Sequence, residues 1–345
     1  MACAILFAEP LLLTSGKPEG FMGKAVQSVL GPISTEKIGA TLIHEHVVTC
    51  CDWSMRMAFG SLYYEDDAVM PLAIQKLREA KKSGIDTIVD GTPVNLGRDI
   101  RNIVRAAEES GVNVIASSGF FHQEDPFVSY KPEEELKELL MRDCTLGMQD
   151  TGALPGMMKC AVGRKGLTPT VKKLLRVTAG VSAETGLPVF CHSVPELHQG
   201  PPILNLLEAQ GVPARAVIIG HHGDTDDIGY LEAVLRRGCY LGLDRFGMVW
   251  ENPATTAEKR AATLFALWRK GYGDQLLIGH DYAPYDGFSP AWQAYRANPG
   301  NDAPGYTCFG TVIVPLLKKM GMTGNDIRHL LADNPRRFFE EAYTG

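Results

Sequence analysis

The feature that most constrains the fold is a regular alternation between short apolar runs and longer amphipathic segments. Eight apolar runs recur along the chain, at Ala40–His46, Thr87–Thr92, Asn113–Phe121, Gly156–Val162, Pro188–His192, Ala216–His221, Cys239–Asp244 and Gln275–Asp281. Each is apolar along most of its length, as expected of a parallel strand covered on both faces. The pattern therefore predicts eight parallel strands.

Segments of helical periodicity separate these runs, and several of them end at a glycine. They are Asp66–Ser83, Arg98–Ser110, Pro132–Asp150, Thr168–Thr185, Pro201–Gln210, Asp226–Arg237, Thr255–Lys270 and Gly310–Met320. Eight strand–helix units indicate an α/β protein of the (β/α)8, or TIM barrel, class. A doubly wound open sheet is the alternative, but no glycine fingerprint follows the first strand.

Both ends of the barrel sequence carry additional elements. A Gly31-Pro32 turn signal predicts a short N-terminal hairpin over residues 29–39. The tail Thr323–Tyr343 predicts two short C-terminal helices broken before Pro335. We expect residues 1–21 to be a poorly structured extension and 22–345 to form the barrel domain. A cleaved export signal is the alternative for the apolar N-terminus, which lacks a basic residue before its apolar run.

Charge and cysteine content narrow the class of protein. A formal net charge of −6 at pH 7, with no basic cluster, argues against a nucleic-acid partner or an anionic membrane surface. The chain has no apolar run approaching the roughly 20 residues of a membrane span. Its 8 cysteines show no CxxC spacing, so we expect reduced thiols in the cytoplasm.

Polar residues with metal-binding chemistry stand at the predicted strand ends. They are His44 and His46 on the first strand, Lys159 on the fourth, His192 on the fifth, His221 on the sixth and Asp281 on the eighth. In a (β/α)8 barrel the C-terminal strand ends meet at one mouth, where active sites lie. Each residue alone has a structural explanation, such as a core histidine or a helix cap. Together, four histidines and a carboxylate suit Zn²⁺, Mn²⁺, Co²⁺ or Fe²⁺.

Lys159 is the unusual member of this set, because a protonated amine repels a metal ion. It lies in the apolar run Met157-Met158-Lys159-Cys160-Ala161, where burial favours the neutral amine. A neutral amine can react with CO₂ to give a carbamate, a carboxylate-like group able to bridge two ions. The alternative is a lysine that extends its ammonium group from a strand end into water.

The ordered set Leu42-Ile43-His44-Glu45-His46, Lys159, His192, Ile219-Gly220-His221 and His280-Asp281 resembles the phosphotriesterase family of the amidohydrolase superfamily. Gly31-Pro32-Ile33 and Asp333-Asn334-Pro335 strengthen the resemblance, which extends from about Val26 to Phe339. It implies two divalent ions, zinc first among them, with His44, His46 and Asp281 on the buried ion and His192 and His221 on the exposed one. N6-carboxylysine at Lys159 and a hydroxide would bridge the ions, and Asp281 would carry the proton. It also implies a small-molecule substrate and a homodimer.

The segment Leu243-Asp244-Arg245-Phe246-Gly247 resembles the lactonase-like branch of this family, with Arg245 as a positioning cation or, alternatively, a surface ion-pair partner. Asp224 matches a position implicated in proton relay, with helix capping as its alternative. Two departures weaken the lactone assignment. Phe121 stands where that branch has a tyrosine, and Tyr282-Ala283-Pro284-Tyr285 lacks the usual cysteine-containing pattern.

We therefore expect a hydrolase of a lactone or carboxyl ester, with promiscuous phosphotriesterase activity. One alternative is an amidase or peptidase-like hydrolase of an N-acyl amino acid or dipeptide. Another is a catalytically silent, metal-stabilised barrel. The aromatic-rich loop Tyr282–Cys308 either faces an apolar substrate or anchors itself to the barrel or to a dimer partner.

Overall fold

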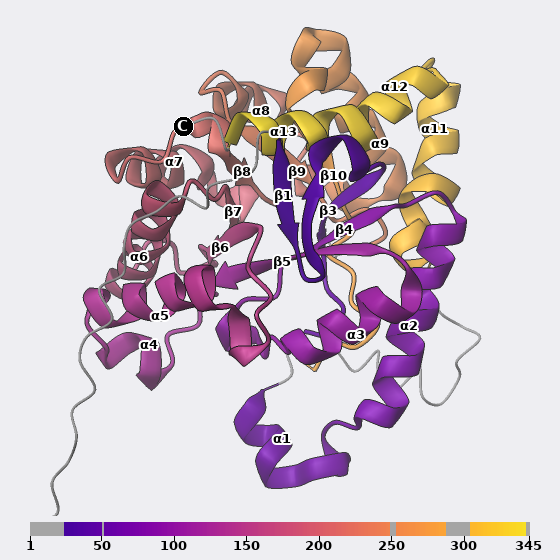
Figure 1. Ribbon diagram of the computed structural model, residues 1–345. Coiled ribbons are helices and arrows are strands. Elements are labelled where there is room, and N and C mark those ends of the chain that lie inside the picture. The colour runs from indigo at the N-terminus through magenta and orange to yellow at the C-terminus, as the bar shows by residue number, and fades with distance from the viewer. Residues whose placement is uncertain (1–23, 50–51, 249–252, 288–303, 343–345) are drawn as a thin grey trace, which may run out of the picture.

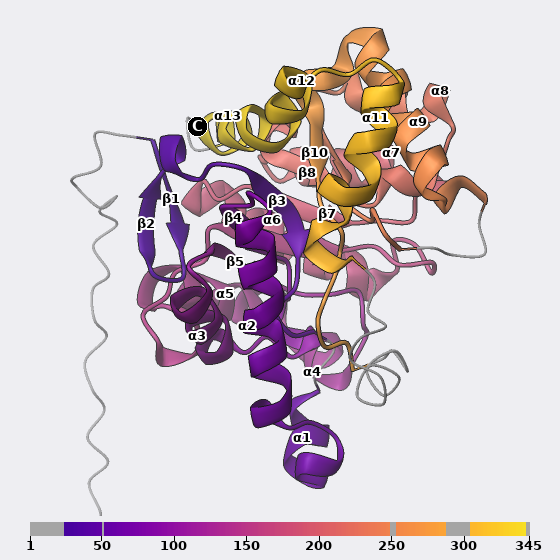
Figure 2. The ribbon, with the colours of Figure 1, turned by 90° about the vertical axis from the view of Figure 1, so that its right-hand side faces the viewer.

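Eight parallel strands form one sheet whose order follows the chain, with helices packed around its outside (Figures 1 and 2). The computed structural model describes residues 24–49, 52–248, 253–287 and 304–342. The strands are β3 (Thr41–Glu45), β4 (Thr87–Asp90), β5 (Asn113–Gly119), β6 (Met157–Ala161), β7 (Val189–His192), β8 (Val217–Ile219), β9 (Tyr240–Leu243) and β10 (Leu276–Ile278). The predicted (β/α)8 barrel is confirmed.

The seam between the first and last barrel strands is closed just beyond the end of β10. The Asp281 amide donates to the His44 carbonyl at 3.0 Å, and the His46 amide donates to the Tyr282 carbonyl at 2.9 Å. Strand closure and the candidate site thus share the same residues. Several strands are shorter than predicted, because His221 (φ 68°) and Asp281 (φ 53°) turn into the left-handed region and leave the sheet.

The helices between the strands correspond to the predicted segments. They are α2 (Asp66–Lys82), α3 (Ile100–Ser110), α5 (Glu133–Leu146), α6 (Pro169–Thr185), α7 (Gly200–Ala209), α8 (Ile228–Leu235), α9 (Ala257–Leu267) and α11 (Val314–Lys319). Two shorter helices, α1 (Trp53–Phe59) and α4 (Pro126–Tyr130), were not predicted from periodicity. Each is only one or two turns long and begins at an aspartate cap, Asp52 or Asp125, which is a weaker signal than a long amphipathic pattern.

The barrel interior is a packed apolar core to which every strand contributes one side chain. These are Ile43, Val89, Ile115, Met157, Phe190, Ile218, Tyr240 and Leu277. Val26 and Ile38 from the N-terminal segment, together with Phe338 and Phe339, complete the same core. The interior is therefore closed at the end opposite the strand C-termini.

The N-terminal hairpin differs in its bounds from the predicted one. It consists of β1 (Ala25–Ser28) and β2 (Gly31–Ser34), so the turn lies at Val29-Leu30 and Gly31-Pro32 opens the second strand. Gly31 has φ 107°, a conformation that favours glycine. Thr35 then donates to Glu340 at 2.9 Å, which ties the hairpin region to the C-terminal helix α13 (Asn334–Ala342).

The C-terminal helices also differ from the expectation of a break before Pro335. Helix α12 (Gly324–Arg328) continues through a π-helical turn, His329–Asp333, directly into α13. Pro335 lies directly after this π-helical turn, in which the Asn334 amide donates to the carbonyl of His329, five residues earlier. The Asn334 side chain donates to the carbonyls of Gly273 and Leu276, which anchors this junction at the base of β10.

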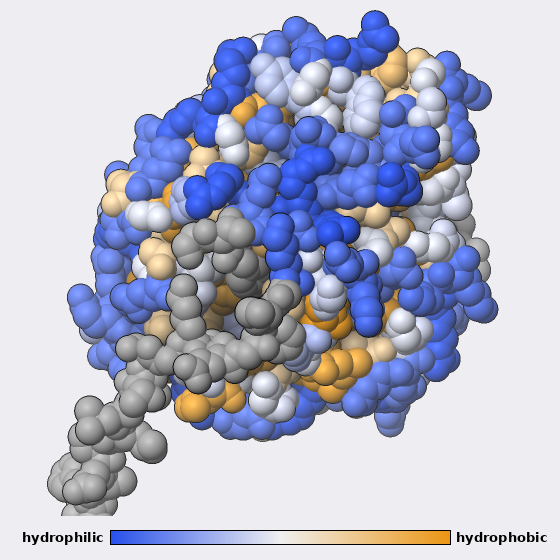
Figure 3. Space-filling view, turned by 45° about the horizontal axis from the view of Figure 1, so that its top comes forward, coloured by the Kyte–Doolittle hydropathy of each residue, from blue (hydrophilic) through white to orange (hydrophobic). Residues whose placement is uncertain are grey.

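Hydrophilic residues dominate the face of the molecular surface that is drawn in Figure 3. Within the described ranges, no helix has the length and apolar character needed to cross a membrane. Five cysteines in these ranges, Cys144, Cys160, Cys191, Cys239 and Cys308, are free thiols. The predicted N-terminal extension and residues 288–303 of the aromatic loop lie outside the described residues.

Candidate metal centre

The barrel mouth brings all six predicted ligand residues into one cluster. His44 lies at its centre, with Nε2 2.7 Å from Lys159 Nζ and 3.5 Å from Asp281 Oδ1. His46 Nε2 lies 3.0 Å from the same Asp281 oxygen. His44, His46 and Asp281 therefore have their ligand atoms within 4.8 Å of one another, close enough to bind one ion.

A second pair of ring nitrogens lies beside the first group. His221 Nε2 and His192 Nδ1 are 2.6 Å apart, and the rings of His44 and His221 have centroids 5.3 Å apart. Burial lowers the pKa of His192 well below its ordinary value, and the neighbouring His221 lowers it further. A neutral imidazole keeps a lone pair, which is the form that binds a metal.

Asp244 is a buried carboxylate that the sequence interpretation did not assign to the site. Its Oδ2 lies 2.8 Å from His44 Nδ1, and its Oδ1 lies 3.2 Å from His221 Nδ1. Although burial raises the pKa of Asp244, its contacts with His221 and His44 lower it below the ordinary value. An ionised carboxylate only accepts hydrogen bonds, so both Nδ1 atoms carry protons and both Nε2 atoms present lone pairs to the cluster.

Asp244 could have been found from the sequence, because it ends the seventh predicted strand at the same edge as the other site residues. Thr92, at the end of the second predicted strand, was missed in the same way. Its hydroxyl lies 2.7 Å from His46 Nδ1 and fixes the orientation of that ring. His44, His221 and Asp244 also form a compact group of three ligand atoms.

Lys159 is 1% exposed and lies 4.0 Å above the Phe190 ring. Burial lowers its pKa to about 8, with Asp281 and Asp244 partly opposing this effect. Because His44 Nε2 has a lone pair, the amine donates to it. Lys159 therefore has a larger neutral fraction near neutral pH than an ordinary lysine.

Local backbone geometry also serves the cluster. A Cβ added at Gly91 would lie 2.4 Å from His44 Cδ2 and 3.2 Å from Lys159 Nζ, so only glycine leaves room for both side chains. His221 and Asp281 both adopt positive φ angles that non-glycine residues rarely take. Such strain is concentrated at functional sites in proteins.

Two arginines and two aspartates extend the cluster toward helix α9. Arg245 donates through Nε to Asp281 at 2.9 Å and through Nη1 to Asp224 at 3.0 Å. Asp224 in turn accepts a 2.5 Å hydrogen bond from Arg260, whose side chain is 2% exposed. Arg245 and Asp224 are thus both within the site, in contact with each other. Arg260 was not predicted, because nothing in the pattern of a helix marks a residue that reaches a distant strand end.

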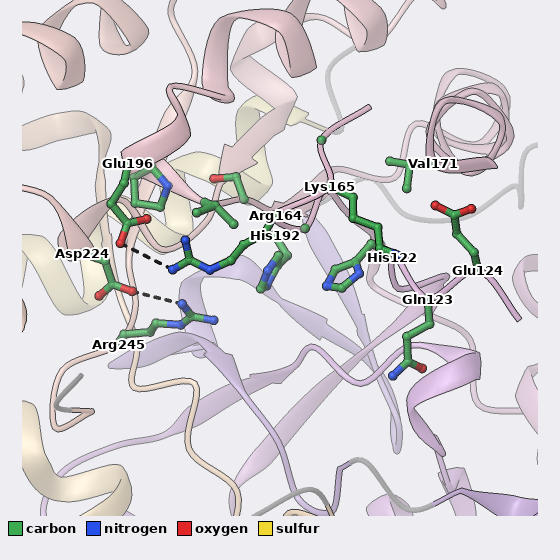
Figure 4. A pocket seen from close by; sticks show the side chains of 15 residues that line it. His122, Gln123, Glu124, Arg164, Lys165, Val171, His192, Glu196, Asp224 and Arg245 are labelled. Carbon is green, nitrogen blue, oxygen red and sulfur yellow. Dashed lines mark hydrogen bonds and ion pairs between the residues drawn. The ribbon is translucent and has the colours of Figure 1, made fainter. Parts of the chain in front are cut away.

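A cavity of about 980 Å³ opens from the cluster, with His192, Asp224 and Arg245 on its inner wall (Figure 4). The Phe121 ring lies near the His192 ring, at a centroid distance of 5.0 Å. Two aromatic residues of the Tyr282–Cys308 loop are buried against the barrel, because Tyr306 donates to the His46 carbonyl and Tyr285 to the Tyr63 carbonyl. These two anchor the loop to the barrel.

The donor set fits divalent metal ions. Neutral imidazoles and carboxylates are the ligands that zinc and related ions prefer, and Asp244 holds two of the histidines in the required tautomer. Fold and site together define a (β/α)8 barrel with a histidine- and aspartate-rich mouth that suits divalent metal ions.

Comparison with known proteins identifies the family. The sequence model of the phosphotriesterase family matches residues 24–339, and the chain belongs to this family. A phosphotriesterase homology protein of Mycobacterium tuberculosis is 33% identical over 319 residues, covering 90% of this chain and 96% of the relative. The structure of the phosphotriesterase from Mycobacterium tuberculosis matches with a TM-score of 0.83 and 32% identity, covering 92% of this chain and 98% of that one.

Relatives with named activities differ in the bond they cleave. An aryldialkylphosphatase of Saccharolobus solfataricus is 32% identical over 311 residues, covering 89% of this chain and 96% of the relative. An N-acetyltaurine hydrolase of Dictyostelium discoideum is 29% identical over 322 residues, covering 88% of this chain and 80% of the relative. The chain is therefore an enzyme of a family of hydrolases, and its particular substrate has to be argued from the site.

Proposed function

We propose that the protein is a binuclear metal-dependent hydrolase of a lactone or carboxyl ester, with phosphotriester hydrolysis as a side activity. His44, His46 and Asp281 would hold one divalent ion, and His192 and His221 the other, with a carboxylated Lys159 shared between them. Zinc is the first choice, and manganese, cobalt or iron would also suit these ligands. When bound, two such ions supply a hydroxide nucleophile near neutral pH and polarise the bond to be cleaved.

The observation that carries the proposal is the orientation imposed by Asp244. Its carboxylate holds His44 and His221 with protonated Nδ1 atoms, so that the Nε2 lone pair of His44 faces Lys159 and that of His221 faces His192. A cluster of core histidines would have no need of this arrangement. The neutral fraction of Lys159 supports its reaction with CO₂, which converts the amine into a carbamate with acceptor oxygens.

The chain's own residues have distinct tasks in this proposal. Asp281 would accept the proton released from the nucleophile, because its carboxylate faces the cluster. Arg245 holds Asp281 in place through a 2.9 Å hydrogen bond, and Asp224 holds Arg245 through a 3.0 Å one. The path Asp281–Arg245–Asp224 leads from the cluster to the cavity wall, since Asp224 and Arg245 both line the cavity.

A second candidate is hydrolysis of an amide in an N-acyl amino acid or dipeptide. Phe121, next to His192, offers no hydroxyl to orient a lactone carbonyl, which weakens the lactonase assignment. Relatives named N-acetyltaurine hydrolase support amide cleavage in the same family. The barrel and the metal ligands would serve either reaction.

Parallel assays distinguish these candidates. The purified, metal-loaded protein is incubated with an acyl-homoserine lactone, an N-acyl amino acid and a paraoxon-type triester. A kcat/KM for the lactone well above the other two supports the first proposal. A preference for the N-acyl amino acid replaces it with the second, and no turnover of any of the three contradicts both.

We also propose a homodimer and a reducing compartment, the cytoplasm, with residues 22–345 as one catalytic domain. Helix α1 and the turn after it expose large apolar side chains, among them Met57 at 85% and Leu62 at 91%, which favours a protein–protein contact. Figure 1 shows α1 projecting from the body of the barrel. Sedimentation analysis of the wild type and of Met57→Asp/Leu62→Asp tests this, since loss of the dimer is expected only in the variant.

A further inference from the structure

The outer wall of the cavity is not used by the proposed reaction. His192, Asp224 and Arg245 form its inner wall, whereas the turn from Gly163 to Gly166 forms part of its outer wall. This turn follows β6, the strand that carries Lys159. It presents Arg164 and Lys165, two adjacent cations, next to the cavity (Figure 4).

Hydrogen bonds and backbone packing hold the Gly163–Gly166 turn in place. The Gly166 amide donates to the Gly163 carbonyl at 3.0 Å, so Arg164 and Lys165 are the central residues of a β-turn. The buried Gln199 side chain donates to the same carbonyl at 2.9 Å. A Cβ at Gly163 would lie 2.8 Å from the His122 ring, so the backbone packs directly on that ring. The two cations therefore project from a defined position.

His122 connects this turn to the candidate metal centre. Its ring centroid is 5.6 Å from that of His192, and the Phe121 ring lies beside it, tilted, at a centroid distance of 4.2 Å. Burial lowers the pKa of His122, and the positive charge of Lys165 lowers it further. His122 and Lys165 line the same cavity as His192.

The carboxylates around the cavity leave these cations largely available. Asp224 is engaged by Arg245 and Arg260, and Glu124 accepts a 2.8 Å hydrogen bond from Thr168. Glu196 lies 4.0 Å from Arg164, the outer limit of an ion pair, and the Arg164 side chain is 76% exposed. Lys165 makes no hydrogen bond or ion pair with any residue in the described ranges. The wall therefore presents more donors than its own acceptors satisfy.

We propose that the substrate carries an anionic group, a carboxylate or a sulfonate, and that Arg164 and Lys165 bind it while the scissile bond lies at His192. The proposal rests on the proposed hydrolase function and names its substrate class. A neutral lactone or triester would leave both cations unused. An anionic substrate would gain a long-range attraction into the cavity and a fixed orientation of its reactive end.

The test uses matched pairs of substrates that differ only in charge. Monomethyl succinate is compared with dimethyl succinate, and N-acetylglycine with N-acetylglycinamide, while N-acetyltaurine distinguishes sulfonate from carboxylate. The variants are Lys165→Met, Arg164→Met/Lys165→Met and, as a matched control outside the cavity wall, Lys172→Met. KM and kcat are measured at low and high salt.

We expect KM for the anionic substrates to rise about tenfold in the double variant, with little change in kcat or in the neutral substrates. The effect should shrink at high salt, because these side chains are exposed to solvent. Lys172→Met should behave as wild type. Turnover of the sulfonate but not the carboxylates, or the reverse, identifies which anionic group the subsite accepts. Equal effects on charged and neutral substrates, or no effect on either, would overturn the subsite and leave the hydrolase function intact.

If none of these compounds and none of the three earlier assay substrates is hydrolysed, the proposed function fails separately. Binding of the same anions to the same proteins is then measured by titration calorimetry. A Kd for N-acetylglycine that weakens about tenfold in the double variant would still support the anion subsite. A Kd that does not change would overturn it.

Discussion

The carboxylate of Asp244 lies 2.8 Å from Nδ1 of His44 and thereby sets which nitrogen of that ring faces the candidate metal centre. Replacing Asp244 with Asn keeps the shape but introduces an amide donor, which would allow the opposite tautomer. We expect the Asp244→Asn variant to bind metal about 10- to 100-fold more weakly. Competition with a chelator of known affinity measures this. Wild-type affinity in the variant would mean that the tautomer is set by other contacts.

Gly91 makes room for His44 and Lys159, and a methyl group there would displace the His44 ring. We expect Gly91→Ala to lose most of its bound metal and its turnover while remaining folded, since only one side chain has to move. Metal analysis and circular dichroism measure the two properties. Gly324→Ala is the control, because a Cβ at Gly324 meets no atom within 4 Å. Full metal content in Gly91→Ala would show that the site tolerates the displacement.

Arg260 is buried and donates to Asp224, so its removal leaves a buried carboxylate with one partner fewer. We expect Arg260→Met to lower the free energy of unfolding by about 3 kcal/mol. Adding Asp224→Asn should recover part of this loss, because the charge that needs compensation is gone. Denaturant unfolding of both single variants and the double variant measures the coupling. Strictly additive effects would refute the interaction.

Glu340 couples pH to stability at the closed end of the barrel. Burial raises its pKa, but hydrogen bonds from Arg336, Lys24 and Thr35 outweigh this and lower the pKa from its ordinary value of 4.5 to about 2. Its contribution is therefore present above pH 4.5 and lost as the pH falls toward 2. We expect Glu340→Gln to be less stable than the wild type by about 1 kcal/mol at pH 6, after allowance for solvent screening.

The Glu340→Gln variant also tests the direction of this pH dependence. Because protonated glutamic acid and glutamine resemble each other, the stability difference should disappear as the pH approaches 2. Chemical unfolding at a series of pH values measures it. A difference that stays constant between pH 6 and pH 3 would show that charge is not its cause.

Strand-end reasoning predicted which candidate ligand residues would lie together, because parallel barrel strands place their C-terminal ends at one mouth. His44, Lys159 and His192 could be located from the apolar runs alone. Asp244 ends such a run too, but its role depends on which neighbouring rings it reaches. The left-handed turns at His221 and Asp281 are set by tertiary contacts, which strand periodicity does not encode.

Other contacts could not be predicted from the sequence, because they join elements that are far apart along the chain. Arg260 lies on a helix whose pattern marks it only as polar, and its partner is Asp224 on another segment. The hairpin turn lies at Val29-Leu30, earlier than predicted, because the Gly31-Pro32 signal marks the start of a strand as readily as a turn. Pro335 lies within a continuous helical segment instead of ending a helix, and a π-helical turn directly precedes it.

The central claim is that a modified Lys159 and two metal ions form the reactive centre, and metal content together with turnover tests it most directly. Protein purified with divalent metal and bicarbonate is compared with Lys159→Ala by elemental analysis, intact mass and hydrolysis assays. We predict about two ions per wild-type chain and a carboxylated lysine in the mass, with loss of metal and turnover in the variant. Turnover that survives in Lys159→Ala would contradict the account.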